Sequence, residues 1–316
     1  MKDSVRCEAF YFGAGRAARF CLLYEPVGRA PRGKLLYVPP FAEEMNRCRH
    51  PAAVAARKLA HQGWLVLQMD LAGCGDSAGD FAEANWAGWL EDLRHGLTLL
   101  ERRMSGPLLL WAVRAGALLA ADLIEHRYAA ANTGMVLWQP VLSGAQHLKQ
   151  FLRLRRVRES VRHERTPALA GATPLATREP SSMKKSRAES VLDIVSLEHA
   201  QRRAQGTNHL LRAEWIAGRT VEVAGYTVSP ALAFALDRAV FSVPRDYHGR
   251  VVWFDCVRQE NESAAAINLQ ARAMLKHQGL RVHHQIVVET PFWQSMLIES
   301  APRLVESTCK AMEQLG

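Results

Sequence analysis

Short apolar runs alternate along the chain with longer segments whose apolar residues recur every three or four positions. The short runs predict buried strands, and the longer segments predict helices that pack on them. The first two runs flank a Gly-Ala-Gly turn at 13–15, which predicts an antiparallel hairpin. The eight predicted strands are 6–10, 19–23, 34–38, 64–70, 108–113, 135–141, 251–257 and 283–288. The predicted helices are 52–62, 84–104, 116–128, 263–278 and 294–313.

This alternation predicts an α/β fold with an eight-stranded, mostly parallel sheet flanked by helices. The regular spacing stops after the sixth strand, because about 110 residues separate it from the seventh. We therefore predict a core of residues 1–142 and 221–316 and a lid or cap insertion of residues 143–220. Part of the insertion is predicted to be disordered, since 165–189 is rich in Pro, Ser, Thr, Ala and Lys. The whole arrangement resembles the α/β-hydrolase fold.

Composition narrows the class of protein. The 316 residues are 48% hydrophobic and 22% charged, which suits a folded chain and excludes wholesale disorder or a coiled coil. We expect a soluble, cytoplasmic protein, because no apolar run has the length of a membrane helix and the first residues do not resemble a secretory signal. Six cysteines without paired C-x-x-C spacing favour free thiols. The sequence offers no phosphate loop, dinucleotide fingerprint or metal-ligand cluster, so we expect no cofactor and no metal.

The net charge of +9 is concentrated in the predicted insertion. Residues 149–219 hold 15 Lys or Arg against 7 Asp or Glu, which leaves the remainder nearly neutral. A predicted helix at 149–165 combines an apolar stripe with a basic face. This pattern is typical of a helix on an anionic membrane surface, and also of a lid helix packed over a pocket. Nucleic-acid binding is disfavoured, because the segment has almost no aromatic residue besides Phe151 that could stack on bases.

The turn after the fifth strand carries the nucleophile in α/β hydrolases, within the frame G-x-S-x-G. Here the frame is A-V-R-A-G at 112–116, so Arg114 stands at the serine position. A guanidinium stays protonated and cannot attack a carbonyl. A second match to the frame, at 75–79, places Ser77 after the fourth strand without a helix directly behind it. We interpret Asp76 and Ser77 as bonding the backbone of their own loop.

The other members of a catalytic triad are hard to find, so the catalytic residues stay unknown. No histidine follows the eighth predicted strand, and we interpret His283 and His284, at the start of that strand, as ordinary solvated residues. Asp255 and the segment 258–262 offer an acid after the seventh strand, but without a histidine that acid lacks a catalytic partner. The nucleophile candidates by residue type alone are Cys48 and Cys74.

Four strings far apart in the chain carry a more specific resemblance. They are VPPFAEEMNRCR at 38–49, DLAGCGDSAGDF at 70–81, VEVAGY at 221–226 and PFWQ at 291–294. Together they resemble the exosortase A system-associated hydrolases, type 2. This resemblance implies a hydrolase-fold protein that serves bacterial exopolysaccharide biosynthesis and protein sorting. In that family the turn after the fifth strand, which we call the elbow, also looks like G-x-R-x-G. Ala112 departs from the first glycine of that elbow, and the basic stretch at 153–205 departs from the family in length.

An arginine on this turn lies beside the amino end of a helix, where a fixed cation predicts an anion-binding pocket. Backbone N–H groups of Phe41, Ala42 and Ala115 are the candidate oxyanion-type donors. The other pocket candidates are Glu43, Glu44, Asn46, Arg47, Asp76, Phe292 and Trp293. The alternative is an internal ion pair of Arg114 with Glu43, Glu44 or Asp76.

Two functions therefore stay open. The first is a hydrolase-fold protein that takes a small-molecule anion or an acyl-type ligand. The second is a catalytically inactive binding module, or an accessory protein recruited to an anionic membrane surface by the 149–165 helix.

Overall fold

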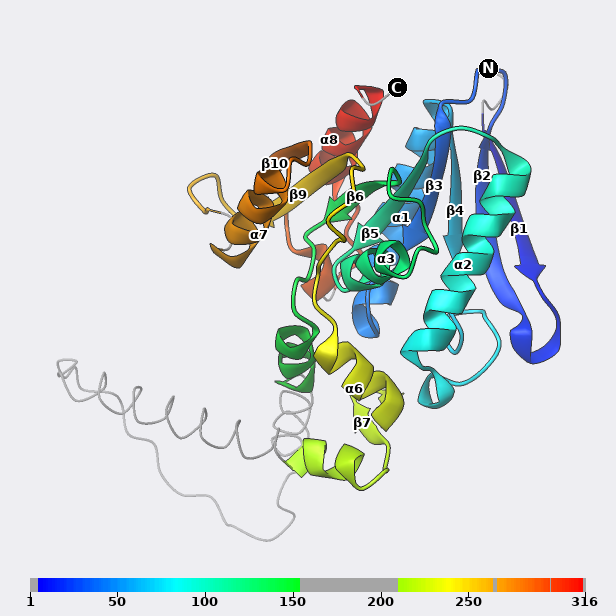
Figure 1. The fold of residues 1–316 in the computed structure, drawn as a ribbon. Coiled ribbons are helices and arrows are strands. Elements are labelled where there is room, and N and C mark those ends of the chain that lie inside the picture. The colour runs from blue at the N-terminus through cyan, green and yellow to red at the C-terminus, as the bar shows by residue number, and fades with distance from the viewer. Residues whose placement is uncertain (1–4, 154–209, 264–265, 296, 315–316) are drawn as a thin grey trace, which may run out of the picture.

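An eight-stranded sheet forms the centre of the computed structural model, which describes residues 5–153, 210–263, 266–295 and 297–314 (Figure 1). The strand order is β1-β2-β4-β3-β5-β6-β9-β10. β1 (Val5–Phe12) and β2 (Arg19–Pro26) form the predicted antiparallel hairpin. β2 also pairs antiparallel with β4, and every other neighbouring pair is parallel. The remaining strands are β3 (Gly33–Val38), β4 (Trp64–Met69), β5 (Leu108–Val113), β6 (Gly134–Trp138), β9 (Val251–Val257) and β10 (Val282–Val288).

Helices cover both faces of the sheet (Figure 1). One face carries α1 (Glu43–His61) and α8 (Pro302–Glu313), and the other carries α2 (Trp86–Arg103), α3 (Gly116–Glu125) and α7 (Ala266–His277). Successive residues of β5 serve the two cores, since Leu110 packs on the α2 and α3 side and Trp111 on the α1 side. The predicted α/β fold is confirmed.

Some predicted boundaries were wrong. α1 begins at Glu43 rather than at 52, because two acids in the first turn favour a helix start and the helix continues through Pro51. α8 begins at Pro302 rather than at 294, since a 3₁₀ turn, η3 (Phe292–Gln294), occupies the predicted start. β6 ends at Trp138 rather than at 141, because the next residue, Gln139, adopts a φ of 42°.

The segments that follow β6 gather at the carboxyl ends of the parallel strands (Figure 1). They include helical residues 144–153 and 210–216, a hairpin of β7 (Val221–Val223) and β8 (Tyr226–Val228), and α6 (Pro230–Arg238). Most of the predicted insertion, with the disordered stretch and the basic helix beyond residue 153, lies outside the described residues. Across the described ranges, no helix has both the length and the apolarity needed to cross a bilayer.

Candidate functional site

A tight turn joins β5 to α3 and holds Arg114 with a φ of 53°, in the left-handed region. Gly116 begins α3, and a Cβ at that position would lie 2.3 Å from the carbonyl oxygen of Val38. Only glycine therefore allows α3 to approach β3 so closely. The amide of Arg114 donates to the Trp138 carbonyl at 3.0 Å, which ties the turn to the end of β6. The local sequence thus fixes Arg114 at the carboxyl end of β5.

The Arg114 guanidinium is buried and pairs with one carboxylate. Its Nη2 lies 3.1 Å from Oε1 of Glu44, and its Nε lies 3.3 Å from both oxygens of the same carboxylate. Nη1 donates to the carbonyl of Gln139 at 3.2 Å, and the guanidinium carbon stands 4.9 Å from the centre of the Trp293 ring. The side chains of Arg114 and Glu44 are only 10% and 13% exposed. The internal ion pair is therefore formed, and Glu44 compensates the arginine charge.

Three backbone N–H groups at this site are available as hydrogen-bond donors. Ala42 has a φ of 51° and a ψ of −127°, and Ala115 precedes the first residue of α3. Across the described part of the chain, no protein acceptor bonds the amide N–H of Phe41, Ala42 or Ala115. All three residues line a cavity of about 10 Å³ with apolar walls that include Trp86 and Leu119. A space of this size holds about one water molecule, so the site as described is closed.

Several predicted pocket residues meet around this turn. Arg47 donates to the carbonyl of Trp293 at 3.2 Å, and Asn46 donates to the Tyr226 hydroxyl at 3.1 Å. Phe292 is buried with its ring 6.2 Å from that of Trp138. Strings 38–49, 221–226 and 291–294 are thus brought together by direct contacts. Asp76, by contrast, is exposed and no ion pair joins it to Arg114 among the described residues.

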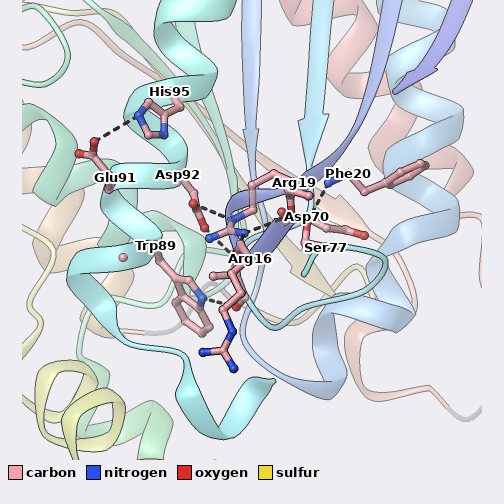
Figure 2. Close-up of polar contacts among 12 residues, drawn as sticks. Arg16, Arg19, Phe20, Asp70, Ser77, Trp89, Glu91, Asp92 and His95 are labelled. Carbon is pink, nitrogen blue, oxygen red and sulfur yellow. Dashed lines mark hydrogen bonds and ion pairs between the residues drawn. The ribbon is translucent and has the colours of Figure 1, made fainter. Parts of the chain in front are cut away.

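Ser77 belongs to a structural loop, as Figure 2 shows. Its hydroxyl donates to the carbonyl of Asp70 at 2.5 Å and accepts from the amide of Phe20 at 2.9 Å. Beside it, Arg19 pairs with Asp92 at 2.7 Å and joins β2 to α2 (Figure 2). The interpretation of Ser77 as a backbone-bonding residue is confirmed. For Asp76 the interpretation was wrong, because the contact is made by its backbone amide, which donates to the Asp70 carboxylate at 3.0 Å.

The two cysteine candidates are buried and poorly suited to nucleophilic attack. Burial raises the pKa of Cys74 to about 12. Burial, together with the nearby Glu44 carboxylate, raises the pKa of Cys48 well above its ordinary value, although Arg114 and Arg47 act in the opposite direction. Because the thiolate is the reactive form, burial and the raised pKa values disfavour both thiols as nucleophiles.

The interpretation of His284 as a solvated residue was wrong. Its Nε2 lies 2.9 Å from Oδ2 of Asp255, which is 1% exposed and lies inside β9 rather than after it. The same carboxylate accepts from Asn268 at 2.7 Å and pairs with Arg272, both on α7. The acid and the imidazole are therefore used to dock α7 on the sheet. His283 is exposed, as predicted, and Glu262 accepts from the amide of Arg258 at 2.7 Å.

His147 is a residue of this site that the sequence did not reveal. It lies on the helical segment 144–153, is 4% exposed, and its ring centre is 5.9 Å from that of Phe41. Neither ring nitrogen has a hydrogen-bond partner within the described ranges. Burial lowers the pKa of His147; the Glu44 charge opposes this shift and the Arg114 charge adds to it. No motif surrounds His147, so a sequence gives no signal for it.

The buried imidazole predicts a loss of stability in acid. The pKa of His147 in the folded chain is below its ordinary value of 6.5. Below about pH 6.5 the unfolded chain therefore binds more protons at this residue than the folded chain does. The stability that neutral His147 contributes is present above about pH 6.5 and is lost as the pH falls. We expect His147→Phe to flatten the fall in unfolding free energy between pH 7 and pH 5, measured by urea titration. The exposed His277→Phe serves as control, and an equal flattening in both variants would contradict the assignment to His147.

The sheet order, the flanking helices and the turn at Arg114 define the class of protein, an α/β hydrolase. A profile of the family described as serine aminopeptidase, S33, matches residues 29–213, which is more than half of the chain. The chain belongs to this family. No curated protein sequence matches it.

Solved structures with the same fold extend over most of the chain. Est1E from Butyrivibrio proteoclasticus, with ferulic acid bound, is 11% identical with a TM-score of 0.52 over 97% of both chains. Brefeldin A esterase, a bacterial homologue of human hormone sensitive lipase, is 12% identical with a TM-score of 0.51 over 99% of this chain and 77% of its own. A thermostable carboxyl esterase from Bacillus coagulans, in complex with glycerol, is 14% identical with a TM-score of 0.50 over 89% of each chain. At these identities the similarity establishes the fold alone.

Proposed function

We propose that Arg114 occupies the nucleophile position of the fold and that the protein binds a ligand there instead of acting as a serine hydrolase. The nucleophile of α/β hydrolases sits on a strained turn between a strand and a helix. The observation that carries the proposal is the φ of 53° at Arg114, between β5 and α3. The other candidate nucleophiles do not replace it, because the Ser77 hydroxyl is bonded to backbone and burial raises the pKa of both cysteines.

A fluorophosphonate probe tests this proposal. We expect no covalent labelling of the purified protein under conditions in which an active serine hydrolase, added as a positive control, is labelled to completion. The physical reason is that no activated serine hydroxyl lies on the β5–α3 turn. Mass spectrometry of the intact protein gives the readout. Labelling that disappears in Ser77→Ala would overturn the proposal, since it would make Ser77 the nucleophile.

The proposed ligand is an acyl-type or anionic small molecule. The amides of Ala42 and Ala115 suit a carbonyl or carboxylate oxygen. Because the cavity beside them has room for about one water molecule, its apolar walls have to move apart to receive the carbon skeleton of the ligand. Arg114 suits the charged end of an anion through its planar fork. Since Glu44 already occupies that fork, an anionic ligand has to compete with the Glu44 carboxylate.

We also propose that the chain belongs to the exosortase A system-associated hydrolases, type 2, and serves bacterial exopolysaccharide biosynthesis or protein sorting. The contacts among the resemblance strings support this assignment. Asn46 bonds Tyr226, the Phe41 and Phe81 rings lie 5.8 Å apart, and the Phe81 and Tyr226 rings lie 5.0 Å apart. The strings that carry the resemblance therefore surround one site rather than being scattered over the surface.

A further inference from the structure

A larger cavity lies at the amino ends of the parallel strands, whereas the Arg114 turn lies at their carboxyl ends. Its volume is about 600 Å³, which falls in the range of small-molecule sites. It opens where the parallel strands begin, next to the paired residues Lys34 and Leu108 and the paired residues Leu109 and Gly134. Ligands of open α/β sheets bind outside the carboxyl ends of the strands. The ligand site expected for this fold is therefore at the other end of the strands and does not account for this cavity.

Lys34 brings a buried positive charge to this cavity. The residue is 5% exposed, and its Nζ donates to the carbonyl of Met104 at 2.8 Å. An ammonium has three hydrogens to donate, and this carbonyl takes one of them. Within the described ranges, no carboxylate forms an ion pair with Lys34. Because a buried charge without a counterion is costly, an anion in the cavity would stabilise it.

Basic and apolar side chains line the rest of the cavity. Two exposed side chains at the rim, Arg250 and His248, add basic groups, whereas Glu101 is the acid in the lining. Apolar side chains of Leu108 and Leu109 form part of the wall. The cavity thus combines positive charge from Lys34 and Arg250 with apolar surface.

We propose that this cavity binds a small organic anion. The carboxylate, sulfonate or phosphate group of the ligand is received by Lys34 and Arg250, and its apolar body packs on Leu108, which pairs with Lys34 across the two strands. A charged donor paired with an anion is a strong hydrogen bond, and the buried setting of Lys34 strengthens it further. The site is independent of Arg114 and of the function proposed there.

Binding of 8-anilinonaphthalene-1-sulfonate tests the proposal, because this probe joins a sulfonate to an apolar ring system and fluoresces when it is bound. We expect saturable binding at one site on the wild-type protein. We expect Lys34→Met and Arg250→Glu each to weaken binding by about tenfold or more, the loss of a hydrogen bond to a charged group. Arg114→Ala is expected to bind as the wild type does, which separates this site from the elbow.

The exposed position of Arg250 keeps the test decisive if Lys34→Met does not fold. Arg219→Glu is the matched control, because Arg219 is also exposed and the charge change is the same. Wild-type affinity in Arg250→Glu, or equal weakening in Arg250→Glu and Arg219→Glu, would overturn the proposal. Weakening confined to Arg250→Glu and Lys34→Met, with Arg219→Glu unchanged, would support it.

Discussion

Asp255→Ala is expected to lower the free energy of unfolding by about 3–5 kcal/mol, the cost of breaking a buried ion pair from one side. The carboxylate of Asp255 accepts hydrogen bonds from four side chains, on β9, β10 and α7. Its removal leaves the guanidinium of Arg272, 8% exposed, without a counterion. It also leaves the indole N–H of Trp253 and the amide of Asn268 without their acceptor. The loss is therefore dominated by uncompensated polar groups rather than by lost volume.

Urea unfolding monitored by far-ultraviolet circular dichroism measures this effect. Asp246→Ala is the control, because it removes an acid from an exposed pair with Arg127, and we expect no measurable change. The double variant Asp255→Leu with Arg272→Met replaces the pair by apolar side chains, and we expect it to recover the part of the loss that comes from the uncompensated Arg272 charge, while Trp253 and Asn268 still lack their acceptor. A loss of less than about 1 kcal/mol in Asp255→Ala would mean that the cluster does not hold α7 in place.

The centre of the sheet was predictable because the strands β3, β4, β5, β6 and β9 are buried on both faces. The run LLLWAV at 108–113 is apolar at every position, which a strand between two helical layers requires. Its neighbour β3 is also buried throughout and is apolar from residue 35 to residue 38. Such runs stand out from helical segments of period three to four, so the number and order of the strands along the chain follow from the pattern. The turn after β5 was predictable for the same reason, since small residues after such a strand indicate close approach of a helix.

The partners of the polar residues were not predictable. Three acids were equal candidates for Arg114, and the choice of Glu44 depends on α1 beginning at Glu43, which places that carboxylate in the first turn of the helix. His284 joins Asp255 because parallel pairing sets His284 beside Trp253, two residues from the acid. These contacts depend on register and on helix starts. An error of one residue in the register of a strand or in the start of a helix changes these partners. Hydrophobic periodicity does not determine registers and helix starts to within one residue.

Glu44→Gln is expected to raise the affinity of the elbow for small anions by about 10- to 100-fold, the equivalent of a hydrogen bond to a charged group. In the wild type, Nε and Nη2 of Arg114 already donate to Glu44, so an incoming carboxylate or phosphate forms few new hydrogen bonds with the guanidinium. Glutamine preserves the length of the side chain and removes the competing charge. Arg114 keeps its bond to the Gln139 carbonyl and its place over Trp293, so the cation stays positioned. Isothermal titration with inorganic phosphate and with benzoate gives the affinities.

Two comparisons assign the effect to Arg114. Glu43→Gln makes the same change of charge at the preceding position of α1, so an equal gain in that variant would indicate a general change of potential instead of a freed fork. Glu44→Gln combined with Arg114→Ala should lose the whole gain, because the cation that attracts the anion is then absent. Equal affinities in the wild type and in Arg114→Ala would eliminate anion binding at the elbow. The site would then be left to uncharged acyl ligands held by the amides of Ala42 and Ala115, which line an apolar cavity separate from the Glu44–Arg114 pair.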